Sequence, residues 1–365
     1  MKKKPRTSIS IDPGRSMRTN DKSYTDEEKI LVDRYIESFT VKELKTFLSA
    51  KNLSVDGKRE DLLSRIREER SAGTISFSEL VAELDRTQPW GAQHVILFGE
   101  PAGLPNADSF EGLTEFRELL KSVKLLKALG KRIALILPEA LTVSAIEYSD
   151  VALRITAVER RHGFVRDEDM DEWGTDEHGQ RVHKRAYIEE INRGLIIFEW
   201  DRIKNVAMLQ ITRLPTNDDY DKALDRFRRV VRKWLDLSRF PLLDPRSAVK
   251  ALHQEEKDLG VKAARARACG IKYDTKAGGS IETTSATSKL SILSDSATSQ
   301  AASIGLQSGV GRNGNFYWRD HPTASGGERG LHVKILGKAG RIHFPTDEKE
   351  EDIRHVLKNI RELCK

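Results

Sequence analysis

The sequence predicts a small all-helical segment followed by a larger mixed α+β domain with a largely antiparallel sheet. At roughly 100 to 200 residues per domain, a chain of 365 residues has room for two or three domains. Apolar residues recur at helical spacing between residues 24 and 87, whereas most apolar runs between residues 90 and 365 are short and typical of strands. We therefore expect a helical module at 24–87 and one α+β domain at 90–365.

Composition indicates a polar protein without a membrane-spanning segment. Hydrophobic residues make up 38% and charged residues 32%, and the mean hydropathy is -0.52. No run approaches the ~18 apolar residues of a transmembrane helix, and the first residues lack the apolar core of a secretory signal. Cys269 and Cys364 are far apart and have no neighbour at metal-ligand spacing. We expect an intracellular protein with no membrane contact, no disulfide and no cysteine-based zinc site.

The net charge of +6 is concentrated at the N-terminus. The first twenty residues hold six basic side chains and one acid, which gives a local charge of +5. Because they are also rich in Ser, Thr, Pro and Gly, we expect a basic disordered tail at 1–23. Such a tail adds phosphate contacts, serves as a nuclear address or is simply a solvated terminus. Its candidates for secondary DNA contacts are Lys2, Lys3, Lys4 and Arg6.

Capped helices open the helical module. A first helix begins after Thr25, and a second begins after Thr40, which has Glu43 at capping-box spacing. Positions 41, 44, 47 and 48 place apolar side chains on one stripe of that second helix, and positions 62, 63 and 66 do the same for a third. Between them, Leu53 fills the space between the helices and Gly57 allows a turn.

Residues 39–69 resemble the SAP domain, a helix-extended loop-helix module that binds DNA. The resemblance rests on the opening Thr-Val-x-Glu-Leu-Lys at 40–45, on Leu53, on Gly57-Lys58-Arg59 and on the ending Leu-Leu-x-Arg-Ile at 62–66. Gly57 permits a tight entry into the following helix, whose free N–H groups and dipole favour a phosphate.

The resemblance implies contact with the backbone of double-stranded DNA, often with a preference for A·T-rich sequence through groove shape. It assigns this role to Thr40, Lys42, Lys45, Gly57, Lys58 and Arg59. Residues 39–70 carry eight basic and six acidic side chains, so one such module binds weakly and loses affinity quickly with salt. We interpret it as a tether; the alternative is a plain helical hairpin used for packing or protein contact.

The first part of the larger domain has an α/β-like pattern. A further helix begins at Ser76, and His94–Phe98 is typical of a buried strand. Residues 109–129 have helical spacing. We expect residues 132–137 to form a strand and the following residues, through Ile146, to form a short helix.

The later part predicts an antiparallel sheet. Strand-like runs occur at 151–158, 187–191, 195–200 and 206–214, and a long helix follows residue 216. Arg265 and Arg267 lie in a second basic strip and are further candidates for secondary DNA contacts. Eleven of the residues 280–299 are Ser or Thr, so we expect a mobile segment at about 280–308. A hairpin at 331–344 and a final helix close the domain.

The sequence contains only weak patterns that could indicate catalysis or metal binding. Residues 309–314 match G-x-G-x-x-G but lack the preceding strand and following helix of a dinucleotide site. Acidic residues crowd 167–177 with three histidines nearby, and we interpret this stretch as a solvated loop and assign no metal site. Glu199, Asp201 and Lys204 are the only candidates for a Mg²⁺-dependent nuclease centre.

These patterns favour a non-enzymatic DNA-binding protein without a cofactor. The SAP-like module would tether the α+β domain to double-stranded DNA, and that domain would contact other proteins. One alternative is a nuclease that the module targets to DNA, which alone would need Mg²⁺. The other is an assembly subunit whose helices bind protein. We expect a cytoplasmic, chromosome-associated location, or a nuclear one if the source is eukaryotic.

Overall fold

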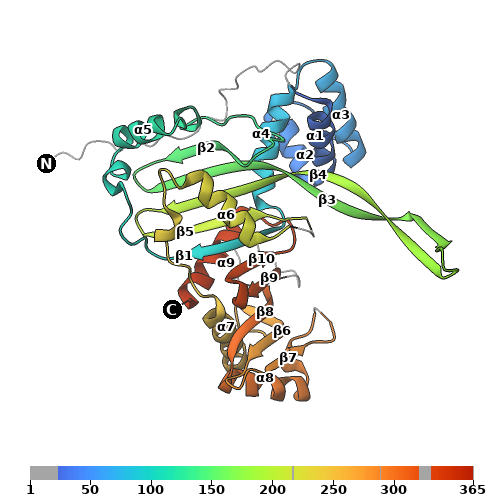
Figure 1. The fold of residues 1–365 in the computed structure, drawn as a ribbon, viewed down its shortest axis with the longest axis vertical. Helices are drawn as coiled ribbons and strands as arrows, with labels where there is room; N and C mark the ends of the chain where they lie inside the picture. The colour runs from blue at the N-terminus through green and yellow to red at the C-terminus, as the bar shows by residue number, and fades with distance from the viewer. Residues whose placement is uncertain (1–23, 216–217, 288, 320–329, 365) are drawn as a thin grey trace.

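The computed structural model describes residues 24–215, 218–287, 289–319 and 330–364. Within these ranges the chain forms a bundle of four helices and a ten-stranded antiparallel sheet with helices on both faces (Figure 1). The bundle consists of α1 (Asp26–Ser38), α2 (Val41–Ala50), α3 (Arg59–Ser71) and α4 (Phe77–Thr87). The predicted fold class, a small helical module before a larger α+β domain with an antiparallel sheet, is confirmed.

Local signals in the sequence define the ends of the bundle helices. Thr25, Thr40 and Ser76 each cap a helix and form a capping box with the glutamate three residues later, as expected. The apolar stripes meet in one core that includes Leu31, Leu44, Phe47, Leu62, Ile66, Leu80 and Leu84. Ile136 and Leu137 of the larger domain belong to the same core. The bundle is therefore packed against the larger domain by apolar contact.

The sheet has the strand order β2-β3-β4-β5-β1-β10-β9-β8-β6-β7, with every strand pairing antiparallel. Its strands are β1 (Gln93–Phe98), β2 (Thr142–Tyr148), β3 (Ala152–Thr175), β4 (Arg181–Asp201), β5 (Val206–Thr212), β6 (Ala266–Asp274), β7 (Ser280–Thr284), β8 (Val310–Trp318), β9 (Leu331–Leu336) and β10 (Arg341–Phe344). The first strand in the sequence thus lies in the middle, where it joins two halves of the sheet.

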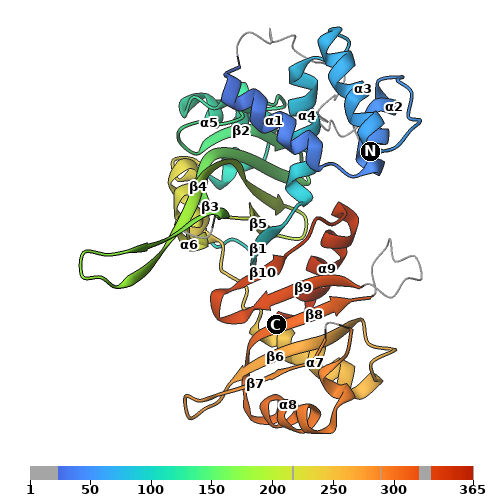
Figure 2. The same ribbon diagram turned by 90° about the vertical axis from the view of Figure 1, so that its right-hand side faces the viewer.

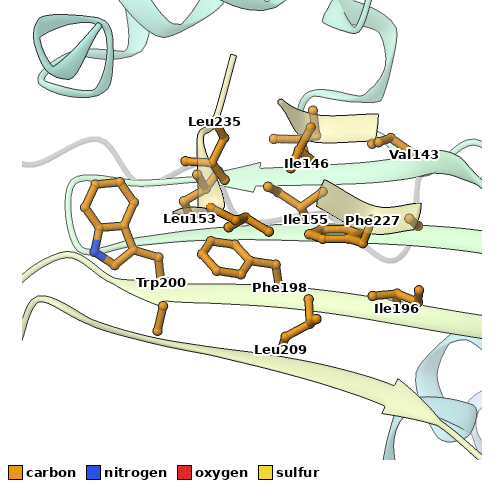
Figure 3. Packing of buried hydrophobic residues seen from close by; sticks show 14 of the residues in the cluster. Val143, Ile146, Leu153, Ile155, Ile196, Phe198, Trp200, Leu209, Phe227 and Leu235 are labelled. Atoms are coloured by element: carbon orange, nitrogen blue, oxygen red, sulfur yellow. The ribbon is translucent and has the colours of Figure 1, made fainter. Parts of the chain in front are cut away.

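Helices cover opposite faces of the two halves. The α-helices are α5 (Leu113–Ser122), α6 (Tyr220–Val231), α7 (Arg246–Leu259), α8 (Ser296–Ser308) and α9 (Glu350–Leu363). Short 3-10 helices occur at η2 (Gln88–Trp90), η3 (Ala107–Phe110), η4 (Leu126–Ala128), η5 (Leu237–Arg239), η6 (Ile292–Ser294) and η7 (Gly337–Ala339). Helices α5 and α6 cover one core (Figure 3), and α7 to α9 cover the other.

Strand β1 serves both cores because its side chains alternate between the faces. Ile96 and Phe98 enter the core beneath α5 and α6, whereas Val95 and Leu97 enter the core beneath α7 and α9. All of β1 is buried, as the apolar run in the sequence predicted.

Strands β3 and β4 continue beyond the sheet as a two-stranded ribbon, which we call the β3–β4 arm (residues 163–190; Figures 1 and 2). Its pairing runs from Gly163 opposite Glu190 to Thr175 opposite Arg181, with an irregularity between Asp167 and Glu172. The sequence led us to expect a solvated loop between separate strands. That expectation is wrong, because the two segments pair as strands. The sequence did not reveal the ribbon, because strands exposed on both faces carry no apolar alternation.

The strand expected at 94–98 and the helix expected within 109–129 are present as β1 and α5, but the rest of the α/β-like pattern predicted through residue 146 is wrong. Residues 132–137 form no strand, and β2 occupies the place of the expected short helix. Ile133 donates one backbone hydrogen bond to Ser144, at 2.7 Å, while Ile136 and Leu137 are buried against the helical bundle. The last two residues of this apolar run are therefore buried against the helical bundle, an arrangement that periodicity alone does not distinguish from a strand.

The Ser/Thr-rich stretch at 280–308 contains β7, η6 and α8 instead of the expected mobile segment. Asp295 caps α8 by accepting a hydrogen bond from the Thr298 N–H at 2.8 Å. Small residues let the helix approach the sheet closely: a Cβ at Gly305 would lie 2.4 Å from the Tyr273 ring. The Ser/Thr-rich composition suggested mobility because small side chains are common in disordered segments. They also allow close packing, as in α8.

Candidate nucleic-acid interface

The loop between α2 and α3 is held in a specific extended conformation. Asn52 and Gly57 adopt positive φ values of 57° and 109°, which reverse the chain at the two ends of the loop. The Arg65 guanidinium donates hydrogen bonds to the backbone carbonyls of Ser54 and Asp56, at 2.8 and 3.0 Å. Loop and helix therefore form one rigid unit.

Gly57 permits the tight entry into α3, as the sequence suggested. A Cβ at this position would lie 2.7 Å from the Cβ of Asp61. The Lys58 backbone N–H donates to the Asp61 carboxylate, at 2.7 Å. Because this carboxylate already occupies the start of α3, a phosphate there depends on the Lys58 side chain more than on free backbone N–H groups.

Thr40 and Arg59 make contacts within the bundle. The Thr40 side chain accepts from the Glu43 N–H at 3.3 Å as the cap of α2. Arg59 donates to the backbone carbonyls of Glu37 and Phe39, so it ties the start of α3 to the junction of α1 and α2. These bonds bring the starts of α2 and α3 together on one side of the bundle.

Three lysines carry the available positive charge of this surface. Lys42 and Lys58 are exposed and Lys45 is half-exposed, and none of the three forms an ion pair with a residue that the structure describes. The other cations of the segment are engaged. Lys51 pairs with Glu79 at 2.5 Å, Arg67 pairs with Glu37 at 2.5 Å, and Arg70 pairs with Asp33. We call Lys42, Lys45 and Lys58 the lysine triad.

A groove of about 1070 Å³ separates α2 from the larger domain. Its lining includes Lys42 of the triad, Arg213 after β5 and Lys349 before α9, all exposed. Glu43, Glu190, Asp347 and Glu350 line it as well. Arg213 and Lys349 were missed from the sequence because they are isolated cations that only the fold brings near the bundle. With both signs of charge, the groove does not extend the lysine triad into a basic channel.

Buried polar contacts fix the bundle on the sheet. Arg193 of β4 pairs with Asp85 of α4, and it also donates to the Gln88 side chain at 2.8 Å. The side chains of Arg193 and Asp85 are 1% and 6% exposed. The Tyr35 hydroxyl lies in the same cluster, and burial raises its pKa. The module is therefore held in one orientation relative to the sheet.

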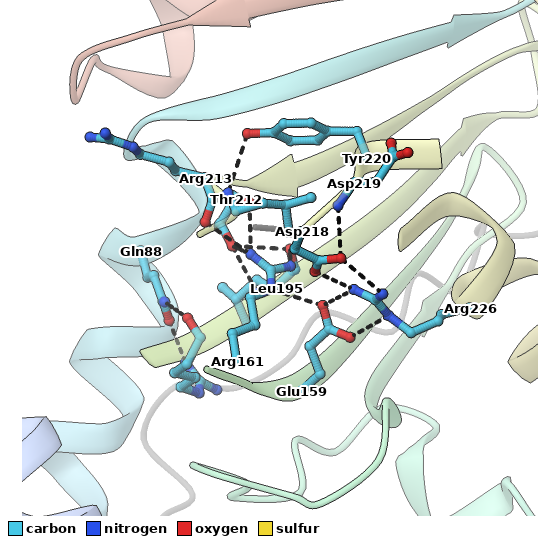
Figure 4. Close-up of polar contacts among 12 residues, drawn as sticks. Gln88, Glu159, Arg161, Leu195, Thr212, Arg213, Asp218, Asp219, Tyr220 and Arg226 are labelled. Carbon is cyan, nitrogen blue, oxygen red and sulfur yellow. Dashed lines mark hydrogen bonds and ion pairs between the residues drawn. The ribbon is translucent and has the colours of Figure 1, made fainter. Parts of the chain in front are cut away.

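A second polar network secures the root of the β3–β4 arm (Figure 4). Arg161 of β3 donates to Glu159 at 2.8 Å and to the Thr212 carbonyl at 2.8 Å, and Arg226 of α6 donates to Glu159 at 3.0 Å. Burial lowers the pKa of Arg161 while the Glu159 carboxylate opposes that shift. Arg161 lies directly over Gly194, where a Cβ would be 2.0 Å from its Nε. This network positions α6 and the arm.

The predicted secondary DNA contacts do not join this surface. Arg265 pairs with Glu255 at 2.7 Å, and Arg267 lies over the Tyr317 ring at 5.3 Å. Both lie at the β6 end of the molecule, remote from the bundle (Figure 1). Lys2, Lys3, Lys4 and Arg6 lie outside the described residues.

The candidate nuclease residues have structural partners. Glu199 accepts two hydrogen bonds from Arg354, at 2.6 and 2.9 Å; burial opposes ionisation, yet Arg354 holds the pKa of Glu199 below its usual value. Asp201 accepts from the Lys204 N–H at 2.9 Å in the turn between β4 and β5. Across the described part of the chain, no group of three or more His, Cys, Asp or Glu side chains is arranged to hold a metal ion.

The SAP domain family matches residues 36–70, which comprise the end of α1, α2, the extended loop and most of α3. No curated protein matches the chain. The match confirms the resemblance and indicates nucleic-acid binding. Among the residues that the structure describes, no helix is long and apolar enough to span a bilayer.

Proposed function

We propose, from the SAP domain at residues 36–70, that this protein binds double-stranded DNA and thereby holds its α+β domain on the chromosome. The observation that carries the proposal is the lysine triad: three exposed or half-exposed cations without ion-pair partners among the described residues, beside a loop of fixed shape. Lysines of this kind contact phosphates and give affinity without sequence readout.

The small number of available cations predicts a weak, salt-sensitive interaction. Three phosphate contacts correspond to a slope of about -2.7 for the logarithm of the association constant against the logarithm of salt concentration. Any contacts from the basic residues of 1–23 would steepen that slope. A protein of this kind occupies DNA broadly and without selecting a particular sequence.

The tether is rigid in this proposal. The bundle shares an apolar core with Ile136 and Leu137 and a buried ion pair between Asp85 and Arg193. DNA bound to the lysine triad therefore sets the orientation of the whole sheet, including the β3–β4 arm. A flexible linker would impose no such orientation.

We further propose that the α+β domain contacts other proteins through the β3–β4 arm. Its exposed apolar side chains are Phe164, Val165, Met170, Trp173, Tyr187 and Ile188, each more than half exposed. Residues 163–190 carry nine acids and four Lys or Arg residues, so the arm repels phosphates and suits a basic protein surface with apolar contacts. The arm and the lysine triad thus serve different partners.

Duplex binding by the triad is tested with the full chain and the variant Lys42→Gln/Lys45→Gln/Lys58→Gln. Fluorescence anisotropy with an A·T-rich duplex should show an affinity at least tenfold lower for the variant, because three phosphate contacts are lost. The matched control is Lys121→Gln/Lys127→Gln/Lys131→Gln, which removes the same charge from exposed positions around α5. Equal affinities for the two variants would contradict the proposal.

The arm is tested by replacing residues 168–185 with Asn-Gly, which joins Asp167 to Ala186, already opposite each other in the ribbon. Thermal stability and duplex affinity should stay unchanged because the arm's exposed apolar side chains contribute to no core. A photo-crosslinking residue at Trp173 should capture a discrete protein, and Glu168→Gln/Glu172→Gln/Glu177→Gln should weaken that capture. A crosslinker at Lys121 is the control; equal capture at both positions would count against the arm.

Location follows from the proposed binding. Association with the chromosome implies a cytoplasmic, DNA-associated protein, or a nuclear one if the source is eukaryotic. Microscopy of a fluorescent fusion should show DNA-associated signal that becomes diffuse when the lysine triad is replaced.

A further inference from the structure

The outer part of the β3–β4 arm, residues 167–185, projects away from the rest of the chain (Figures 1 and 2). Met170 and Trp173 in this part are 62% and 61% exposed, although both are large apolar side chains. The same part carries seven acids and three Lys or Arg residues, which gives a net charge of -4. A partner that covers it must therefore supply positive charge as well as apolar contact.

Helix α6 carries matching positive charge on its exposed side. Its two acids are already paired, because Asp221 contacts Arg341 at 3.2 Å and Asp225 contacts Arg228 at 3.2 Å. The exposed cations of α6 and of the two residues after it form no ion pair with a residue that the structure describes. We call them the α6 cation row: Lys222, Arg229, Arg232 and Lys233.

The α6 cation row lies close to the root of the arm. Arg226 of α6 donates to Glu159 of β3 at 3.0 Å, four residues before the arm starts at Gly163 (Figure 4). The twelve residues of α6 span about 18 Å. The arm from Gly163 to Thr175 spans up to about 40 Å. One arm is therefore long enough to lie along a second arm and reach the row behind its root.

The arm cannot reach the α6 cation row of its own chain. Strands β3 and β4 pair without interruption from the sheet out to Asp167 opposite Ala186, so the arm leaves the sheet as a direct extension of these strands. Arg161 fixes its root by donating to Glu159 and to the Thr212 carbonyl. Folding the arm back would break this pairing. An acidic arm on the row must therefore come from another molecule.

We propose that the partner of the arm is a second copy of this chain. In a two-fold dimer the two arms lie side by side in opposite directions, and the outer part of each arm contacts the α6 cation row of the other copy. A two-fold axis forms both contacts at once and closes the assembly at two copies. This inference rests on the proposed role of the arm as a protein contact and names its partner.

Apolar contact and charge have different roles in this dimer. Burial of Met170 and Trp173 stabilises it, whereas charge complementarity selects the α6 cation row over other surfaces. Because the ion pairs stay partly exposed, added salt weakens the dimer. Dimer formation leaves duplex affinity unchanged when the duplex is short enough for a single helical bundle.

Sedimentation velocity of the full chain tests the dimer directly. As concentration rises, the native chain should form a species of twice the chain mass of 41.3 kDa, and added salt should weaken it. The arm variant Glu168→Lys/Glu172→Lys/Glu177→Lys places cations opposite the α6 cation row. It should raise the dissociation constant about tenfold or more, because like charges then meet.

The helix variant Arg229→Glu/Arg232→Glu/Lys233→Glu should raise the dissociation constant by a similar factor. An equimolar mixture of the arm variant and the helix variant should form the dimer again, since each contact then joins opposite charges. The mixture also checks the fold, because an unfolded variant cannot dimerise with its complement. If either variant melts early, Gln at the same positions replaces it and should still weaken self-association several-fold.

The matched control Lys121→Glu/Lys127→Glu/Lys131→Glu reverses the same charge around α5 and should dimerise as the native chain does. The inference is overturned if the native chain stays at the chain mass, if this control weakens the dimer as much as the helix variant does, or if the mixture of folded variants stays monomeric. In that event, a crosslinker at Trp173 that captures a different protein preserves the proposed role of the arm, whereas no capture removes that role too.

Duplex DNA is the competing occupant of the α6 cation row. Arg229→Gln/Arg232→Gln/Lys233→Gln should bind a short A·T-rich duplex as tightly as the native chain does. A loss of affinity as large as that caused by replacing the lysine triad would assign the row to DNA and overturn the inference.

Discussion

At the residue scale, ion pairs in this protein contribute unequally to stability because they differ in burial. Asp85 and Arg193 are almost inaccessible to water, whereas the Arg67–Glu37 pair is more than half exposed on both sides. Loss of a partner from a buried pair leaves an uncompensated charge, but an exposed group is rehydrated. The two pairs therefore serve different purposes although both link separate segments of chain.

The substitution Asp85→Ala should lower the free energy of unfolding by about 3 kcal/mol, because Arg193 keeps a buried charge without its carboxylate. Arg67→Gln, the control, should lower it by less than about 1 kcal/mol. Urea unfolding of both variants provides the measurement. If Asp85→Ala is no more destabilising than Arg67→Gln, the bundle is not fixed by this pair.

The same scale explains which site residues the sequence could identify. Gly57 and Lys58 were predicted from the SAP resemblance, and their positions agree with the expected loop and helix start. The engagement of Arg59 by backbone carbonyls could not be predicted, since it depends on how α1 meets α2. Tyr317 and His332 were not recognised as a pair, because the register between β8 and β9 brings them together and the sequence does not reveal that register.

At the element scale, the helices and strands that were predicted correctly are those with a strong local signal in the sequence. The capped helices of the bundle and the buried strand β1 were predicted because caps and apolar periodicity are local. The β3–β4 arm and α8 were not, because the arm has no buried face and α8 gains its stability by fitting small residues against Tyr273. Antiparallel pairing was expected, but the central place of β1 in the sheet depends on long-range register.

The pairing of β1 with β10 joins the two halves of the sheet and contains stacked histidines. The His94 and His343 rings lie 4.2 Å apart at centroids, and His94 also contacts the Tyr220 ring at 3.8 Å. Burial, then His343, Arg341 and Lys334, lower the pKa of His94 to about 3. Burial, then Lys334, His332 and Arg213, lower the pKa of His343 to about 4.

These depressed values predict that acid destabilises the joint between the two halves. The unfolded chain, with a histidine pKa of about 6.5, binds more protons than the folded chain below that pH. Stability from the pair is complete above pH ~6.5 and is lost as pH falls towards about 4, by about 1–2 kcal/mol per histidine at pH 5. Urea unfolding at pH 7 and 5 should show a smaller loss for His343→Gln than for the native protein. His178→Gln, in the exposed arm turn, should behave as native; an unchanged loss in His343→Gln would contradict this account.

At the scale of the whole molecule, the helical bundle and the sheet form one body. Removal of the first 87 residues would expose Ile136 and Leu137 and leave Arg193 without Asp85. Point substitutions at exposed lysines therefore test DNA binding more cleanly than truncation. The lysine triad and the β3–β4 arm lie in fixed relation, so DNA bound at the triad, as proposed, would also set the orientation of the arm.

The proposed function requires that the lysine triad binds duplex DNA through phosphate contacts. The most direct measurement is the salt dependence of duplex affinity for the native chain and for Lys42→Gln/Lys45→Gln/Lys58→Gln. The slope of the native chain should be steeper by about 2.7, one increment of about 0.9 for each lysine. Equal slopes for the two proteins would contradict the claim and place any duplex binding elsewhere on the molecule.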